Sequence, residues 1–168
     1  LTADTVMMEG ATIFTGAFND SGDGIAGNVV LSVREVSLKG GASIQSQNQS
    51  STPELGHGNV TIQGLQGAEF GAAESVTLSG GSSIVSTAFS FGDGGQVAIT
   101  TQSLKMEGPD TTIITSTNSD GRGGDMVVRV QHASLLEGAT IKTLTGSAGL
   151  NAPAAATVTV QGLSGEGS

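Results

Sequence analysis

One short pattern recurs five times in this 168-residue chain and constrains its fold more than any other feature. In each copy an apolar stretch is followed by glycine and then by isoleucine. The copies read VMMEGATI (6–13), VSLKGGASI (36–44), VTLSGGSSI (76–84), LKMEGPDTTI (104–113) and SLLEGATI (134–141). Their closing residues, separated by 31, 40, 29 and 28 positions, are Ile13, Ile44, Ile84, Ile113 and Ile141. A repeat period of about 20–50 residues is typical of solenoids and related repeat folds.

A second pattern lies between these copies and has the period of a β-strand. It reads GNVVLSV (27–33), GNVTIQG (58–64), GQVAITT (95–101), GDMVVRV (124–130) and ATVTVQG (156–162). Alternate residues are apolar, which places them on one face of a strand. The expected inward pairs are Val29/Leu31, Val60/Ile62, Val97/Ile99, Met126/Val128 and Val158/Val160. The 27 glycines disfavour helices, and no helical period is present.

Each unit offers three short strands, exemplified by NVVLSV, EVSLKG and ASIQSQ in the second copy. If a unit forms one coil, equivalent residues stack, so Val29 lies beside Val60 and Ile44 beside Ile84. We therefore predict an all-β fold over residues 1–168, a right-handed parallel β-helix (β-solenoid) of about five coils of roughly thirty residues. The segment GLQGAEFGA (64–72) is predicted to be a loop insertion between strands, which explains the long 40-residue step.

The repeats, written L-x-x-G-A-x-I-x-T and G-x-G-G-N-V-x-I, resemble those of filamentous haemagglutinin-like exoproteins over essentially the whole chain. Bacteria secrete proteins of that family by two-partner systems. The resemblance implies an extracellular or cell-surface rod for adhesion or display, and it implies no particular binding residue. The family's secretion motif lies in a separate N-terminal domain, and nothing here matches it. We therefore expect a non-enzymatic structural or adhesive shaft segment, an excerpt of a longer repeat rod.

Two other interpretations remain open at this point. Neither end shows a capping element, so copies could instead stack end to end into an extracellular fibre. The expected partners are thus neighbouring coils of the same longer chain or end-to-end copies, together with host or surface glycans. The second alternative is a polysaccharide-active β-helix enzyme, which needs acids gathered on one face. Three acids precede a glycine at the same repeat position: Glu9, Glu107 and Glu137. This position predicts a column of side chains, interrupted by Lys39 and Ser79, in which Glu107 and Glu137 are neighbours. We expect the column to be a row of solvated charges rather than a catalytic site.

Charge and composition exclude several other classes of partner. The net charge is −9 with only six Lys and Arg residues, so we expect no nucleic-acid binding. No run of about 18 apolar residues occurs, so we expect no membrane insertion. The absence of Cys excludes disulfides and thiolate metal sites.

Acidic, glycine-rich loops are the best candidates for metal binding. The stretches NDSGDG (19–24), FGDGG (91–95) and SDGRGGD (119–125) resemble calcium-binding nonapeptides and carry Asp20, Asp23, Asp120 and Asp125. The strict nine-residue period is missing, which favours ordinary turns. His57 and His132 have no ligand cluster around them in the sequence. We therefore predict no catalytic, cofactor or metal site.

The aromatic and hydroxyl residues were the remaining candidates. We expect the phenylalanines to pack beneath loops rather than to stack on sugars; they are Phe14, Phe18, Phe70, Phe89 and Phe91. The threonines of 99–103 and 111–117 are interpreted as ordinary strand residues rather than as a flat ice-binding face. Asn48 and Asn59 match Asn-x-Ser/Thr, which we attribute to chance in so polar a chain.

Overall fold

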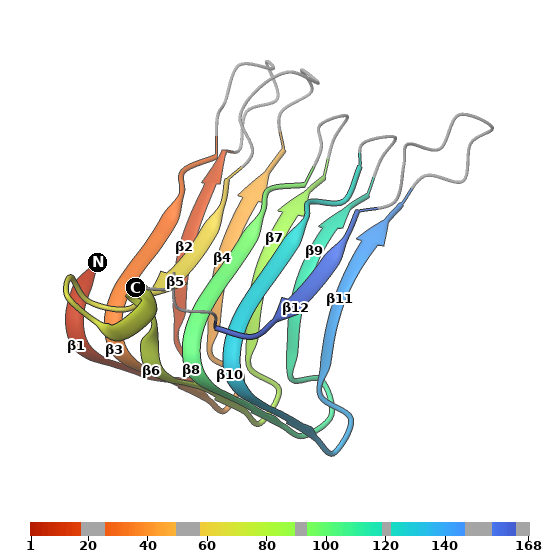
Figure 1. Ribbon diagram of the computed structural model, residues 1–168. Helices are drawn as coiled ribbons and strands as arrows, with labels where there is room; N and C mark the ends of the chain where they lie inside the picture. The colour runs from red at the N-terminus through yellow and green to blue at the C-terminus, as the bar shows by residue number, and fades with distance from the viewer. Residues whose placement is uncertain (18–25, 50–57, 90–93, 119–121, 147–155, 164–168) are drawn as a thin grey trace.

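The computed structural model describes residues 1–17, 26–49, 58–89, 94–118, 122–146 and 156–163. It shows an all-β chain whose parallel strands stack as a β-solenoid of about four turns (Figure 1). The solenoid is as predicted, but the coil count is lower than the predicted five. Five copies of the isoleucine pattern enclose only four complete turns between the first and the last copy.

Two parallel sheets form the walls of the solenoid. The first is ordered β1 (Thr2–Glu9), β3 (Val29–Lys39), β5 (Val60–Gln63), β8 (Val97–Glu107), β10 (Met126–Leu136) and β12 (Val158–Gln161), and β6 (Ala73–Ser79) also pairs with β3 and β8. The second is ordered β11 (Thr140–Thr145), β9 (Thr112–Thr117), β7 (Ser83–Ala88), β4 (Ser43–Asn48) and β2 (Thr12–Ala17). Each coil therefore contributes to both sheets.

The stacking register agrees with the sequence prediction. Val29 pairs with Val60, and Ile44 pairs with Ile84. The five closing isoleucines form one continuous column through the second sheet. Its three central members, Ile44, Ile84 and Ile113, are fully buried. Because like aliphatic residues lie one above another, a narrow apolar core runs along the whole stack.

Each regular coil has two strands rather than the predicted three. The first two predicted strands are continuous in β3, β8 and β10, which are 11 residues long and curve sharply (Figure 1). In β8, the buried Thr101 hydroxyl donates hydrogen bonds to the carbonyls of Ala73 and Ser103. The Thr101 hydroxyl therefore gives these two backbone carbonyls a hydrogen-bond partner where the strand curves, and the strand continues.

The backbone of the turns between the two sheets shows that the predicted stacking of Glu107 on Glu137 is wrong. Gly40 and Gly41 have φ of 58° and 78°, and in the last coil Glu137 and Gly138 take these places with φ of 52° and 85°. Glu137 is therefore a turn residue, and Glu107 pairs with Leu136 instead of stacking on Glu137. The prediction was wrong because it aligned the residues before glycine, whereas in the last coil the left-handed part of the turn already begins at Glu137.

This turn yields a stability prediction. An L-residue in the left-handed region is destabilised relative to glycine by about 1–2 kcal/mol, partly offset by the flexibility of glycine in the unfolded chain. Replacing Glu137 with Gly should therefore raise the free energy of unfolding by about 0.5–1 kcal/mol. Urea denaturation followed by far-ultraviolet circular dichroism measures the change. Glu107→Gly, at the end of a strand, is the control and should give no gain; equal effects of the two substitutions would contradict the turn assignment.

Candidate functional site

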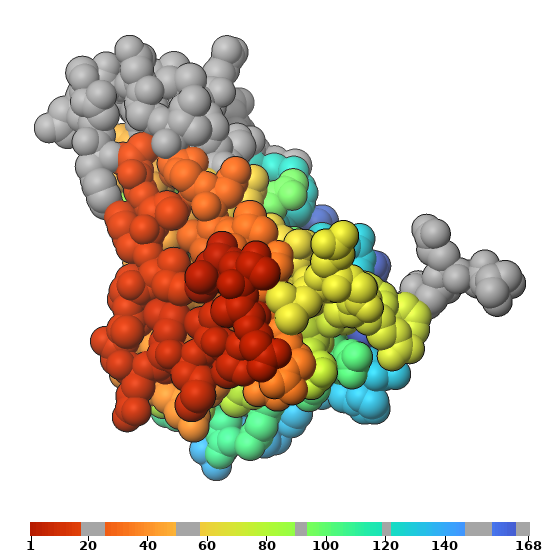
Figure 2. Space-filling model, turned by 90° about the vertical axis from the view of Figure 1, so that its left-hand side faces the viewer, coloured from red at the N-terminus to blue at the C-terminus, as the bar shows by residue number. Residues whose placement is uncertain are grey.

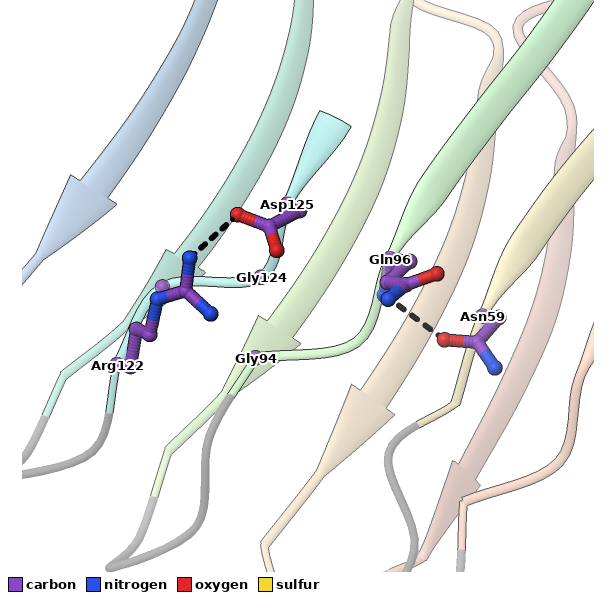
Figure 3. A pocket seen from close by; sticks show the side chains of 7 residues that line it. Asn59, Gly94, Gln96, Arg122, Gly124 and Asp125 are labelled. Carbon is purple, nitrogen blue, oxygen red and sulfur yellow. Dashed lines mark hydrogen bonds and ion pairs between the residues drawn. The ribbon is translucent and has the colours of Figure 1, made fainter. Parts of the chain in front are cut away.

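A ladder of side chains joins the coils at the corner where each long strand begins. The Asn28 side-chain oxygen accepts a hydrogen bond from the Asn59 backbone N–H at 2.9 Å, and the Asn59 oxygen accepts one from the Gln96 N–H at 2.8 Å. Asp125 continues the ladder by accepting from the Thr157 N–H at 2.8 Å. Figure 3 shows the side chain of Asn59 directed at Gln96. Asn28, Asn59 and Asp125, each the residue before an inward Val or Met, therefore connect their coil to the next.

The glycine of the same motif lets the two sheets approach each other. Buried hydroxyls of the second sheet donate to these glycine carbonyls: Ser46 Oγ to Gly27 O at 3.0 Å and Ser86 Oγ to Gly58 O at 2.9 Å. The Thr115 hydroxyl donates to Gly124 O in the same way. A Cβ atom at Gly58 would lie 2.8 Å from Gly27 O, so a side chain does not fit. The Gly-Asn-Val pattern thus combines close approach, an intercoil hydrogen bond and a core residue.

Most of the threonines in 99–103 and 111–117 are buried; Thr100 and Thr112 are the partly exposed ones. Thr111, Thr115 and Thr117 are buried, as is Thr101 in the 99–103 stretch. Their inward orientation leaves them unable to form an ice-binding surface.

A polar hollow of about 280 Å³ lies at this corner and contains the one described calcium candidate (Figure 3). Asp125 Oδ1 accepts hydrogen bonds from the Thr157 N–H, from the Thr157 hydroxyl at 2.9 Å and from Arg122 Nη2 at 2.7 Å. The carboxylate therefore serves to hold the coils together. Asp20, Asp23 and Asp120 lie outside the described residues, and among the described residues no three His, Cys, Asp or Glu side chains gather as metal ligands.

These contacts make stability near Asp125 dependent on pH. The hydrogen bonds from Thr157, first from its backbone N–H and then from its hydroxyl, lower the pKa of Asp125, and Arg122 adds to this effect against a desolvation penalty. A lowered folded-state pKa means that the stabilisation is complete above the unfolded-state pKa and is lost as the pH falls through the folded-state value. Asp125→Asn keeps an acceptor oxygen but does not titrate. The stability advantage of wild type over this variant should shrink as the pH falls from about 5 to about 2, measured by urea denaturation. A constant difference would contradict this role.

A second group of charged residues surrounds Arg34 on the outer face of β3. Arg34 forms a bidentate pair with Asp4, with Nε–Oδ1 at 2.7 Å and Nη2–Oδ2 at 2.6 Å. Glu74 lies 3.7 Å and Glu35 4.0 Å from Arg34 Nη1. The Arg34 bond lowers the pKa of Asp4, and the bond to Asp4 raises that of Arg34. All four side chains are solvent-exposed.

The predicted insertion lies beside this cluster. Residues 64–72 leave the wall between β5 and β6 and contain a short 3₁₀ turn, η1 (Glu69–Gly71). Their own hydrogen bonds close the loop: Gly64 N donates to Gly71 O at 2.8 Å, and Ala72 N donates to Glu69 O at 3.0 Å. In Figure 2 the yellow insertion stands out beside the red strand β1. The loop is thus a folded projection on an otherwise regular wall.

Phe70 at the centre of the insertion is strained and exposed. Its φ is 56°, a left-handed value that destabilises a non-glycine residue by about 1–2 kcal/mol. Its exposed fraction is 43%, against 42% for Phe14 and 41% for Phe89. The expectation that the phenylalanines pack beneath loops is therefore wrong for these three, because their rings leave the narrow aliphatic core. Phe18 and Phe91 lie outside the described residues.

Where the structure describes the remaining candidates, they do not gather into a shared site. His132 is exposed on β10 and pairs in register with Ser103, while His57 lies outside the described residues. Glu9 pairs in register with Lys39, and Glu107 forms an ion pair of 2.8 Å with Lys105. Sequence reasoning missed the ladder at Asn59, although the repeated Gly-Asn-Val pattern was a usable signal for it. It also missed the hollows beside the insertion.

The fold defines the class of this protein as a parallel β-solenoid. Comparison with family models, with curated proteins and with solved structures gives no match for the chain. Among the described residues, no helix has the length and apolarity needed to cross a membrane.

Proposed function

We propose that the chain is a non-enzymatic structural and adhesive shaft segment of a large secreted or cell-surface bacterial exoprotein of the filamentous haemagglutinin-like kind. The observation that carries this proposal is the regular stack itself. The isoleucine column and the inward column of Val29, Val60, Val97 and Met126 repeat from coil to coil in register. Inward side chains build the core, and the side chains of Asn28, Asn59 and Asp125 hydrogen-bond to the next coil. This architecture suits a rod that bears load and displays its outer surface.

The electrostatics of the carboxylates also favour a structural role over catalysis. A general acid at neutral pH needs a raised pKa. The pKa values of Asp4 and Asp125 are lowered instead, chiefly by the hydrogen bonds from Arg34 and Thr157 respectively. These two carboxylates are therefore held ionised as ion-pair and hydrogen-bond partners.

Two measurements on the producing cells and the purified chain test this function. Antibodies raised against the chain should label intact cells or detect the protein in the medium. Labelling only after permeabilisation would contradict a surface or secreted location. The purified chain should release no reducing ends from neutral or acidic polysaccharides, and release of such ends would favour the enzyme alternative.

End-to-end stacking is a second candidate, favoured by the exposed strand edges. At one end Leu135, Leu144 and Val160 have exposed fractions of 42%, 48% and 55%, although Leu135 and Val160 lie in register with the fully buried Met106 and Val128. At the other end Ile13 is only partly buried. Stacking another unit in register would place Ile13 on Ile141 and continue the column. Either further coils of one chain or another copy would cover these edges.

This edge predicts that the isolated chain self-associates. Sedimentation velocity should show species that grow with concentration. The double variant Leu144→Lys/Val160→Lys should be monomeric at the same concentrations, because a buried unpaired charge disfavours the junction. Wild-type protein that remains monomeric at high concentration would contradict the prediction.

A further inference from the structure

The insertion creates two hollows on the outer face of the shaft. One, of about 400 Å³, is lined by the insertion and by the flanking strands β3, β6 and β8; the residues that matter below are Arg34, Leu65, Glu69, Ala72, Glu74 and Gln102. The other, of about 470 Å³, lies against Thr2, Ser32 and Gln63 and shares Leu65 with the first. Both have the size of small-ligand sites. They exist because residues 64–72 leave the wall while β3 and β8 continue past them.

The residues that line the first hollow suit a ligand with hydroxyl groups. Leu65 and Ala72 contribute apolar surface, while Gln102 offers both a donor and an acceptor. Glu69 and Glu74 are acceptors, and the Arg34 guanidinium is a donor held in place by its bidentate pair with Asp4. A sugar presents neighbouring hydroxyls that donate and accept at once, and its C–H faces pack on apolar surface.

The charge around the hollow selects among sugars. Arg34 is the single cation among Asp4, Glu35, Glu69 and Glu74. This excess of carboxylates repels sulfated or uronic polysaccharides and phosphate groups, as does the net charge of −9. The carboxylates accept hydrogen bonds from neutral hydroxyls without such a penalty.

Phe70 adds an exposed aromatic ring on the same loop, although it is not among the residues that line either hollow. It lies between Glu69, which lines the first hollow, and Gly71, which lines the second. The loop that carries it is closed by its own backbone hydrogen bonds, so the ring is presented on a preorganised segment. Aromatic rings provide large apolar faces at little conformational cost, and the C–H face of a pyranose packs well on them.

We infer that the insertion and its two hollows form a binding site for a neutral oligosaccharide. This inference rests on the proposed function and deepens it, because it names the class of ligand that a site on the shaft would bind. Phe70 supplies the stacking surface, and Gln102, Glu74 and Arg34 hydrogen-bond to the hydroxyls.

Titration calorimetry of the purified chain with mannotriose, cellotriose and N-acetylchitotriose tests the site, with trigalacturonate and a heparin tetrasaccharide as anionic probes. We expect at least one neutral trisaccharide to bind and neither anionic probe to do so. Phe70→Gly should weaken binding at least tenfold while raising the melting temperature, because glycine relieves the left-handed strain. A loss of binding together with a gain in stability cannot arise from unfolding. Gln102→Ala should also weaken binding.

Phe89→Ala is the matched control, since Phe89 has the same residue type and nearly the same exposed fraction but lies at the end of β7. It should leave binding unchanged. The inference is overturned if no neutral trisaccharide binds, if only the anionic probes bind, or if Phe70→Gly binds as wild type does. Such a result, combined with antibody labelling of intact cells, would remove the glycan site and leave the proposed shaft function standing.

Discussion

Replacing Gly95 with alanine should destabilise the protein by about 3 kcal/mol, because the new methyl group has no room. A Cβ atom at Gly95 would run into the backbone carbonyl of Gly58 in the preceding coil and would lie 2.7 Å from Ser86 Oγ. Ser86 already donates to Gly58 O, so the substitution strains the hydrogen bond that joins the two sheets. Both coils are fixed by their neighbours in the stack, which leaves little freedom to relax.

Gly27→Ala is the control for this substitution. Gly27 occupies the same place in the motif, but its Cβ would meet only Thr15 at an ordinary 3.5 Å. We expect it to change the free energy of unfolding by less than about 1 kcal/mol in urea denaturation followed by circular dichroism. Equal effects at the two glycines would show that close stacking does not explain why this position of the repeat is glycine.

Replacing Ile84 with alanine should cost about 3–4 kcal/mol, within the range for truncating a buried isoleucine. Ile84 is fully buried at the centre of the isoleucine column, between Ile44 and Ile113. The cavity cannot close, because the strands above and below are held at fixed spacing by their backbone hydrogen bonds.

The end of the same column provides the comparison. Ile13 is only partly buried and has one neighbour in the column, Ile44. Ile13→Ala should therefore cost about 1 kcal/mol, since fewer contacts are lost. A larger loss at Ile13 than at Ile84, measured in the same denaturation experiment, would contradict the described stacking.

The stacking could be predicted from the sequence because each coil repeats the same pattern of apolar residues. The isoleucine spacing and the alternating Val29/Leu31 and Val60/Ile62 pairs identified which residues pair, since a one-residue slip would turn the apolar face outward. The hydrogen bond between Asn59 and Gln96 was harder to predict, because it depends on the backbone of the next coil rather than on the sequence neighbours of Asn59.

Other features could not be read from residue type. Glu137 precedes a glycine as Glu107 does, yet the turn uses it in a left-handed conformation, and only backbone angles distinguish the two. The sequence predicts a loop insertion at 64–72, but the hollows beside these residues depend on how the segment folds back on itself. The environment of Arg34 likewise brings together Asp4 and Glu74, which lie 70 residues apart in sequence.

The central claim is that this chain is part of a continuous shaft, and electron cryomicroscopy of the native particle that contains it tests this claim most directly. We predict a continuous rod with an axial repeat of about 4.8 Å, into which this chain fits as successive coils. A compact particle with no axial repeat and a deep acidic cleft would contradict the shaft and favour the polysaccharide-active enzyme.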